Sequence, residues 1–184
     1  MDADEFEGVL IAARSGAQWA WSKLYRALTP QLLGYVRVRG ASDPEGLVGE
    51  VWLQLVRGLE KFSGDWHGFR SWVFLVAHHR LSNERRRFVR KATLPWDGGP
   101  EEGGGMTSSA EEEALGEVST SDALRLLDVL TPDQRSVIAL RVIAGFSVEE
   151  TAEIVGKRAG AVKQLQRRGL DTLRQSIEHA VVTR

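Results

Sequence analysis

The stretch of sequence that decides the fold is Thr131–Arg174, TPDQRSVIALRVIAGFSVEETAEIVGKRAGAVKQLQRRGLDTLR. It predicts three helices whose ends can be read from the residues. A capping box formed by Thr131 and Gln134 begins the first helix. A second capping box starts at Ser147, and Gly156 ends that helix in the left-handed conformation that glycine adopts most easily. The third helix follows Gly156 within about three residues. The last two helices and this short turn have the pattern of a helix-turn-helix.

The third helix of this stretch has one apolar face and one basic face. The apolar face is predicted to consist of Val162, Leu165, Gly169, Leu170 and Leu173. The opposite face carries Lys163, Gln164, Arg167 and Arg168. Cations and an amide on the second helix of such a pair suit the phosphates and base edges of a DNA major groove.

Length and composition limit the possible classes of protein. With 184 residues and 42% hydrophobic content, the chain can form one ordinary domain or two small ones. It has no cysteine, so disulfides and thiolate metal sites are excluded, which fits a reducing compartment. The acidic start MDADEFEG lacks the pattern of a signal peptide, and no apolar run approaches the roughly 18 residues of a membrane span. We therefore expect a cytoplasmic protein that does not insert into membranes.

The net charge of -1 hides an uneven distribution along the chain. Residues 1–94 carry 14 Lys and Arg against 10 Asp and Glu, and residues 123–184 carry 10 against 7. Residues 95–122 carry 8 acidic residues and no basic ones. This middle segment is rich in Gly, Ser and Glu and has no apolar periodicity, so it is predicted to be a disordered linker. Two mildly basic domains, 1–94 and 123–184, are therefore expected on either side of a flexible acidic linker, 95–122.

The first domain is predicted to be helical throughout, which makes the whole chain all-α. Apolar residues recur every three or four positions, and no stretch alternates as a strand would. Thr29-Pro30 is expected to start a helix that ends near Gly40, and Ser42 or Asp43 is expected to cap the next one.

An aromatic residue and a basic run follow in the first domain. Ser63–Gly68 is a loop by composition, and it contains Trp66. A helix then places Phe69 and Trp72 on its apolar side and ends in a basic run, Arg85–Lys91. Phe69 and Trp72 are expected in the core, whereas Trp66 fits a core role and an exposed role about equally.

Three segments together resemble the bacterial sigma factors of the extracytoplasmic-function group. Asp43–Trp52 resembles the family's D-A-E-D-L-x-Q-E-x-F segment, and Phe69–Arg87 resembles F-x-x-W-L-x-x-I-A-x-N-x-x-x-D-x-x-R-R. Thr131–Arg174 is similar to the L-P-x-x-Q-R, G-x-S-x-x-E-I-A and G-T-V-K signatures. The resemblance implies a protein without catalysis of its own or a cofactor, which binds core RNA polymerase and promoter DNA and helps to open the minus-ten element. It also allows an anti-sigma factor as a partner.

The resemblance assigns residues to three surfaces. The polymerase-binding residues would be Asp43, Glu45, Leu47, Glu50 and Trp52. The minus-ten residues would be Trp66, His67, Arg70, His78, His79, Arg80, Asn83, Arg86 and Arg87. The minus-thirty-five residues would be Arg158, Lys163, Gln164, Arg167 and Arg168. Trp66 with His67 and Arg70 would capture a flipped base, because aromatic faces stack on unpaired bases. Arg158 and Leu165 stand where many family members have Ser and Arg, so the promoter sequence is not predicted.

Other readings of the chain compete with this one. A stand-alone dimeric helix-turn-helix regulator, with an N-terminal sensor or dimerisation domain, would explain Thr131–Arg174 equally well. It would not explain an aromatic loop followed by a basic helix end. His78 and His79 are neighbours about 100° apart on a helix, so no metal site is expected from them. No triad, phosphate loop or paired carboxylate indicates an enzyme.

Overall fold

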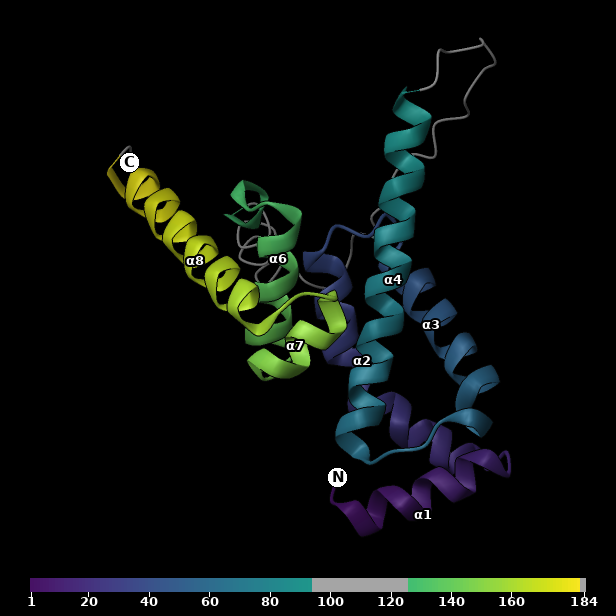
Figure 1. Cartoon of the computed structure of the whole chain (residues 1–184). Helices are drawn as coiled ribbons and strands as arrows, with labels where there is room; N and C mark the ends of the chain where they lie inside the picture. Colours follow the sequence, from purple (N-terminus) through teal and green to yellow (C-terminus); the bar gives the residue numbers. More distant parts are fainter. Residues whose placement is uncertain (94–125, 183–184) are drawn as a thin grey trace.

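The structure, a computed structural model, describes residues 1–93 and 126–182 and consists there of helices without a strand (Figure 1). The first lobe, residues 1–93, contains α1 (Ala3–Arg14), α2 (Gln18–Val38), α3 (Pro44–Gly58) and α4 (Trp66–Thr93). The second lobe, residues 126–182, contains α6 (Pro132–Ile138), the π-helical segment η3 (Ala139–Ile143), α7 (Val148–Val155) and α8 (Ala159–Val182). Short 3-10 turns lie at Leu59–Lys61 and Leu127–Val129. The predicted all-α fold is confirmed, whereas the predicted linker, 95–122, lies outside the described residues.

The helix ends follow local chemistry, as the sequence predicted. Thr131 and Ser147 each form a complete capping box, in which the side chain accepts from the third backbone amide of the helix. Gly156 has a φ of 65° and closes α7 in the left-handed region. Of the two candidates for the cap of α3, Asp43 is the one used, and its Oδ1 accepts from the Gly46 amide at 2.9 Å.

One predicted helix start is wrong, because α2 continues through Thr29 and Pro30 without a break. Leu24, Leu28 and Leu32 are at most 1% exposed and form one apolar stripe on both sides of the proline. Burial of this stripe outweighs the loss of one backbone hydrogen bond at Pro30. The end of α2 near Gly40 is as predicted, and Gly40 has a φ of 76°.

The buried side chains of the two lobes form one main cluster. Tyr35 and Phe74 of the first lobe and Leu140, Phe146 and Ile154 of the second belong to it, and all five are at most 2% exposed. A smaller cluster, Val137, Ala152 and Val162, lies within the second lobe. The second lobe therefore completes its core against α2 and α4 of the first (Figure 1).

The apolar face of α8 differs from the prediction at one residue. Val162 is fully buried, and Gly169 packs so closely on α6 that an added Cβ would lie 2.6 Å from Cδ1 of Ile138. Leu165 and Leu173 are half-buried, whereas Leu170 is 44% exposed. Leu170 lies about 100° around the helix from Gly169, and this step turns it away from α6.

An aromatic cluster closes the end of the first lobe between α3 and α4. Phe62 stacks on Trp72 with 5.3 Å between ring centroids, and Phe69 meets both rings edge on. Gly58 of α3 lies under the indole of Trp72, and an added Cβ would come within 2.8 Å of its Cζ2 atom. The absence of a side chain at Gly58 is therefore what lets Trp72 reach its stacking position.

This close approach predicts opposite effects for two glycines of the same helix. Gly58→Ala should lower the free energy of unfolding by about 1–2 kcal/mol, because a rigid indole ring must shift. Gly49→Ala should raise it by about 0.5–1 kcal/mol, since no atom lies within 4 Å of its added Cβ and alanine favours a helix. Urea unfolding followed by tryptophan fluorescence measures both values, and equal effects would contradict the packing described.

Candidate nucleic-acid interface

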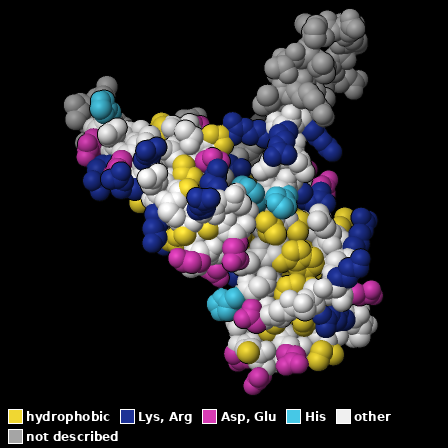
Figure 2. All heavy atoms as spheres, in the orientation of Figure 1, with side chains coloured by type: hydrophobic (Ala, Val, Ile, Leu, Met, Phe, Trp, Pro, Cys, Tyr) yellow, Lys and Arg dark blue, Asp and Glu magenta, His cyan; other side chains and the backbone are white. Residues whose placement is uncertain are grey.

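The C-terminal half of α4 presents an exposed polar and basic face. His79, Asn83, Arg86 and Arg87 are all exposed, and their spacing of three and four residues places them on neighbouring sides of the helix. Figure 2 shows Lys and Arg side chains gathered on this part of α4. Each of the four side chains can donate a hydrogen bond, and two are permanent cations, as contacts with phosphates and base edges require.

Arg80, on the adjacent side of α4, is engaged by α3. Its guanidinium forms an ion pair with Glu50, and its Nε donates to Oε1 of Gln54 at 3.2 Å. Glu50 is 63% exposed in its side chain. A pair that is so open to solvent contributes little stability, so Arg80 can exchange Glu50 for a phosphate at small cost.

His78 does not face the DNA side predicted for it. It is half-buried between the lobes, and its Nδ1 lies 3.0 Å from the hydroxyl oxygen of Tyr35. Burial, together with the nearby charges of Arg39 and His79, lowers the pKa of His78 to about 4. Burial also raises the pKa of Tyr35 to about 12. At neutral pH, His78 is therefore an uncharged side chain that lies between the two lobes and forms a hydrogen bond with Tyr35.

Trp66 was predicted to lie in a loop, but it is the first residue of α4. Asp65 caps this helix by accepting from the Gly68 amide at 2.8 Å. The indole of Trp66 is half-buried, with its ring centroid 5.6 Å from that of Phe6 and 6.3 Å from that of Phe69. The structure thus favours the core role for Trp66. Phe69 is fully buried and Trp72 packs against the core, as predicted for both.

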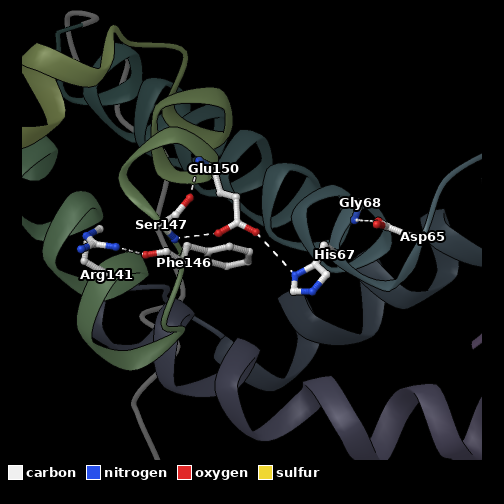
Figure 3. Close-up of polar contacts among 7 residues, drawn as sticks. All are labelled: Asp65, His67, Gly68, Arg141, Phe146, Ser147 and Glu150. Atoms are coloured by element: carbon white, nitrogen blue, oxygen red, sulfur yellow. Dashed lines mark hydrogen bonds and ion pairs between the residues drawn. The ribbon is translucent and has the colours of Figure 1, made fainter. Parts of the chain in front are cut away.

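His67 and Arg70 point toward the second lobe. Nδ1 of His67 lies 3.9 Å from Oε1 of Glu150, as Figure 3 shows. The guanidinium carbon of Arg70 lies 4.2 Å from the ring centroid of Phe146. Burial lowers the pKa of Arg70, and the Glu150 carboxylate acts in the opposite direction. Both predicted minus-ten residues are therefore in contact with the other lobe.

The second lobe exposes the basic face of α8. All five predicted residues are exposed: Arg158, Lys163, Gln164, Arg167 and Arg168. Figure 2 shows basic side chains along this helix. Arg141 fixes α8 to the start of α7, since its Nε donates to Oε1 of Gln166 at 3.2 Å and its Nη1 donates to the carbonyl of Phe146. Arg141 thus links the helices of the helix-turn-helix on their inner side, and the basic outer face of α8 remains exposed to solvent.

The predicted polymerase-binding residues are only partly accessible. Asp43 serves as a helix cap, and Leu47 is half-buried. Glu45 pairs with Arg37 at 2.6 Å, and this hydrogen bond lowers the pKa of its carboxyl. Trp52 is 7% exposed and donates from Nε1 to the hydroxyl of Thr29 at 3.1 Å. Asp43, Glu45 and Glu50 are exposed, and of these Asp43 also caps α3 through its Oδ1.

The sequence did not reveal an apolar hollow between α2 and α3. Its volume is about 330 Å³, and it is lined by Trp21, Ser22, Tyr25, Arg26, Trp52 and Val56. Tyr25 and Val56 are about half exposed, and Leu53 of the same helix as Val56 is 58% exposed. Large apolar side chains left in contact with water indicate a surface for a macromolecular partner. The apolar spacing of Trp21 and Tyr25 was visible in the sequence, but periodicity cannot tell a core face from an exposed one.

Among residues 1–93 and 126–182, no group of three or more His, Cys, Asp or Glu side chains is placed to hold a metal ion. Over the same residues, none of the helices combines the length and the apolar character that crossing a bilayer requires.

Comparisons with known proteins match both lobes. Residues 24–91 match the family Sigma-70 region 2, and residues 126–175 match Sigma-70, region 4. ShbA, an ECF RNA polymerase sigma factor of Streptomyces griseus, is 31% identical over 182 residues, which cover 93% of this chain and 95% of ShbA. SigD of Mycobacterium tuberculosis, another ECF RNA polymerase sigma factor, is 28% identical over 183 residues, which cover 96% of this chain and 86% of SigD.

Two solved structures share the fold. CnrH, solved in complex with the cytosolic domain of CnrY, aligns with a TM-score of 0.69 and 21% identity, covering 95% of this chain and 97% of CnrH. RpoE of Bartonella quintana, solved with the anti-sigma factor NepR, aligns with a TM-score of 0.65 and 18% identity, covering 85% of this chain and 96% of RpoE.

The environment of His78 predicts a pH dependence of stability. Its pKa is about 4 in the folded protein and about 6.5 when unfolded, so the unfolded chain binds more protons below pH 6.5. The contribution of His78 is complete above pH 6.5 and decreases as the pH falls, by about 2 kcal/mol at pH 5. Urea unfolding at pH 7, 6 and 5 should show this decrease in the wild type and a smaller one in His78→Gln. If the free energy of unfolding decreased equally with pH in the two proteins, the pH dependence could not be assigned to His78.

Proposed function

This chain belongs to the extracytoplasmic-function RNA polymerase sigma factors and directs transcription initiation. We propose that its separate surfaces bind core polymerase, the minus-ten element and the minus-thirty-five element. It supplies no catalysis of its own, since RNA polymerase forms the phosphodiester bonds. The single observation that supports the division of labour is that two open basic faces, one on α4 and one on α8, lie on different lobes. The first predicted domain, residues 1–94, would bind polymerase and act at the minus-ten element, and the second predicted domain, residues 123–184, would act at the minus-thirty-five element.

The polymerase surface is proposed to extend from α3 across the hollow to α2. Glu45 and Glu50 provide carboxylates along α3, and Leu53 and Val56 continue the same helix as exposed apolar side chains. Tyr25 of α2 borders the hollow on its other side. Specific protein interfaces usually have an apolar centre surrounded by a polar rim, and the carboxylates of α3 would form part of such a rim. Core RNA polymerase is the occupant that we assign to this surface.

The minus-ten element is proposed to meet the exposed face of α4. His79, Asn83, Arg86 and Arg87 are available as they stand, and Arg80 becomes available when it releases Glu50. Their cationic and amide groups can hold phosphates and the edges of unpaired bases. His67 and Arg70 extend this surface toward the start of α4 once they leave the second lobe. Trp66 and His78, which the structure places in packing roles, support the surface from within.

The minus-thirty-five element is proposed to bind the first turns of α8. In a helix-turn-helix the start of the recognition helix contacts base edges, and later residues contact phosphates. Arg158, Lys163 and Gln164 would therefore contact bases, and Arg167 and Arg168 would contact the DNA backbone.

The remaining parts of the proposal concern partners and location. An anti-sigma factor is proposed as a regulatory partner, because RpoE of Bartonella quintana, which shares the fold, was solved with one. The place of action is the cytoplasm, where bacterial polymerase and promoters are. The stand-alone dimeric regulator is set aside, because residues 24–91 match Sigma-70 region 2, and they make up most of residues 1–94, the sensor or dimerisation domain of that interpretation.

The polymerase surface is tested by two matched substitutions of exposed apolar residues. Val56→Asp should weaken binding to core polymerase at least tenfold, because it puts a charge at the hollow, and it should reduce run-off transcription from a genomic promoter library accordingly. Ile11→Asp is the control, since Ile11 on α1 is 60% exposed and does not line the hollow. Binding is measured by fluorescence anisotropy of labelled protein. If both variants weakened polymerase binding equally, the hollow would not be the polymerase surface. If the wild type with core polymerase did not initiate transcription, the proposed function would be wrong.

The minus-thirty-five surface is tested by the salt dependence of promoter binding. Arg167→Ala should weaken binding of the holoenzyme to a promoter fragment and reduce the slope of log K against log salt by about 1, as expected for one lost phosphate contact. Lys23→Ala serves as the control, because Lys23 on α2 is paired with Glu5 of α1 at 2.5 Å. An unchanged slope for Arg167→Ala would rule out this phosphate contact.

A further inference from the structure

Helix α1 is tied to the connection between α3 and α4 by one charged side chain, Arg14. This residue is the last of α1, and its guanidinium reaches two backbone carbonyls that lie 45 and 48 positions further along the chain. Nε donates to the carbonyl of Leu59 at 3.4 Å, and Nη2 donates to the carbonyl of Phe62. Figure 1 shows this connection beside α1 at one end of the first lobe. A guanidinium has several donors at fixed angles, so it can hold both carbonyls at once.

The carbonyls that Arg14 holds lie where the helical structure of α3 stops. The 3-10 turn Leu59–Lys61 follows α3, and Phe62 after it has an extended backbone, with φ -71° and ψ 132°. The last carbonyls of a helix have no amide partners further along it, and a cation beside them interacts favourably with the negative end of the helix dipole. Arg14 therefore fixes the direction in which the chain leaves this turn.

The position of Phe62 determines the course of the residues that follow. Its ring stacks on Trp72 of α4, and a Cβ added at Gly64 would lie 3.1 Å from its Cζ atom, so the chain folds back over the ring. Asp65 then caps the first turn of α4. Three residues separate Phe62 from the first residue of α4. Because this connection is so short, a shift of the Phe62 carbonyl would also shift the first turn of α4.

The first turn of α4 is the end of the proposed minus-ten surface that lies nearest to Arg14. His67 is exposed on this turn, and Ser63 is exposed in the connection before it. Phe6, which also belongs to α1, packs on the ring of Trp66 with 5.6 Å between the centroids. Helix α1 thus holds this end of the surface at two points, Phe6 from within and Arg14 from outside. The match to Sigma-70 region 2 begins at residue 24, so α1 lies outside it.

We propose that Arg14 is a positioning residue for recognition of the minus-ten element. It makes no contact with DNA, and it holds the connection Phe62–Asp65 and the first turn of α4 in the conformation that binds unpaired promoter bases. The proposal rests on the proposed function, because it concerns the minus-ten surface assigned there. A segment that is ordered before binding does not lose conformational entropy when it binds. Arg14 thus increases the affinity for the opened element without adding a contact.

Hydrogen–deuterium exchange of the free protein tests the positioning role in the absence of DNA. In Arg14→Leu, the hydrogen-bonded amides within residues 62–69 should exchange roughly tenfold faster than in the wild type, whereas those within residues 28–36 of α2 should keep their rates. Lys23→Leu is the matched control, since it also removes an exposed cation that ties α1 to a neighbour, but the partner of Lys23 is Glu5. This control should leave the exchange of residues 62–69 unchanged.

Two promoter fragments test whether this local order is used in promoter binding. One fragment has a mismatched, unpaired minus-ten element. The other is fully paired, and its minus-ten element is replaced by an unrelated sequence, so that the minus-thirty-five element alone holds it. Holoenzyme with Arg14→Leu should bind the unpaired fragment roughly fivefold more weakly than the wild type, and its affinities for the second fragment and for core polymerase should stay within about twofold. Arg14→Lys should restore most of the loss, because an ammonium group can still donate to the carbonyl of Phe62.

The outcomes separate this proposal from the proposed function. If the wild type bound both fragments equally, the minus-ten assignment would be wrong, and the proposal with it. If the wild type preferred the unpaired element and Arg14→Leu kept that preference, Arg14 would not be a positioning residue. Equal losses for both fragments, or faster exchange over the whole chain, would show a general loss of stability and overturn the proposal. A selective loss with unchanged exchange would assign Arg14 to a direct DNA contact instead, whereas a selective loss with faster exchange confined to residues 62–69 would support the proposal.

Discussion

The insertion of Phe146 between α4 and the second lobe is the interaction on which the rest of the structure depends. Its ring lies between Phe74 and Arg70, and the buried residues of the second lobe continue from it into the main core. Apart from the residues that join this core, the described part of the second lobe has a small cluster of Val137, Ala152 and Val162. A lobe of fewer than 60 described residues is too small to bury much apolar surface alone. Contact with the first lobe therefore adds substantially to its stability.

Local chemistry made much of the fold predictable. The caps at Thr131 and Ser147 and the left-handed Gly156 depend on residues within one turn, so the helix-turn-helix could be derived from the sequence. The errors occurred where distant residues decide the outcome. Pro30 remains inside a helix because of the apolar stripe on both sides of it, and Trp66 is half-buried because Phe6, sixty residues earlier, packs on its ring.

The candidate surfaces were predictable to a similar extent. Residues of α8 and the end of α4 are exposed as expected, since a basic helical face next to an apolar one has few other places to lie. His78 was misplaced because its neighbour, Tyr35, is 43 positions away in the chain. The hollow beside Tyr25 was missed because spacing reveals an apolar face but not whether another helix covers it.

The two oxygens of the Glu150 carboxylate have separate partners. Oε2 accepts from the Ser147 amide at 2.6 Å and completes the cap of α7, whereas Oε1 faces His67 (Figure 3). The bond to the Ser147 amide does not involve the first lobe, so the cap of α7 does not depend on the contact with His67. The start of α7 is consequently ordered by residues of its own helix, so binding to DNA does not have to supply the entropy cost of ordering it.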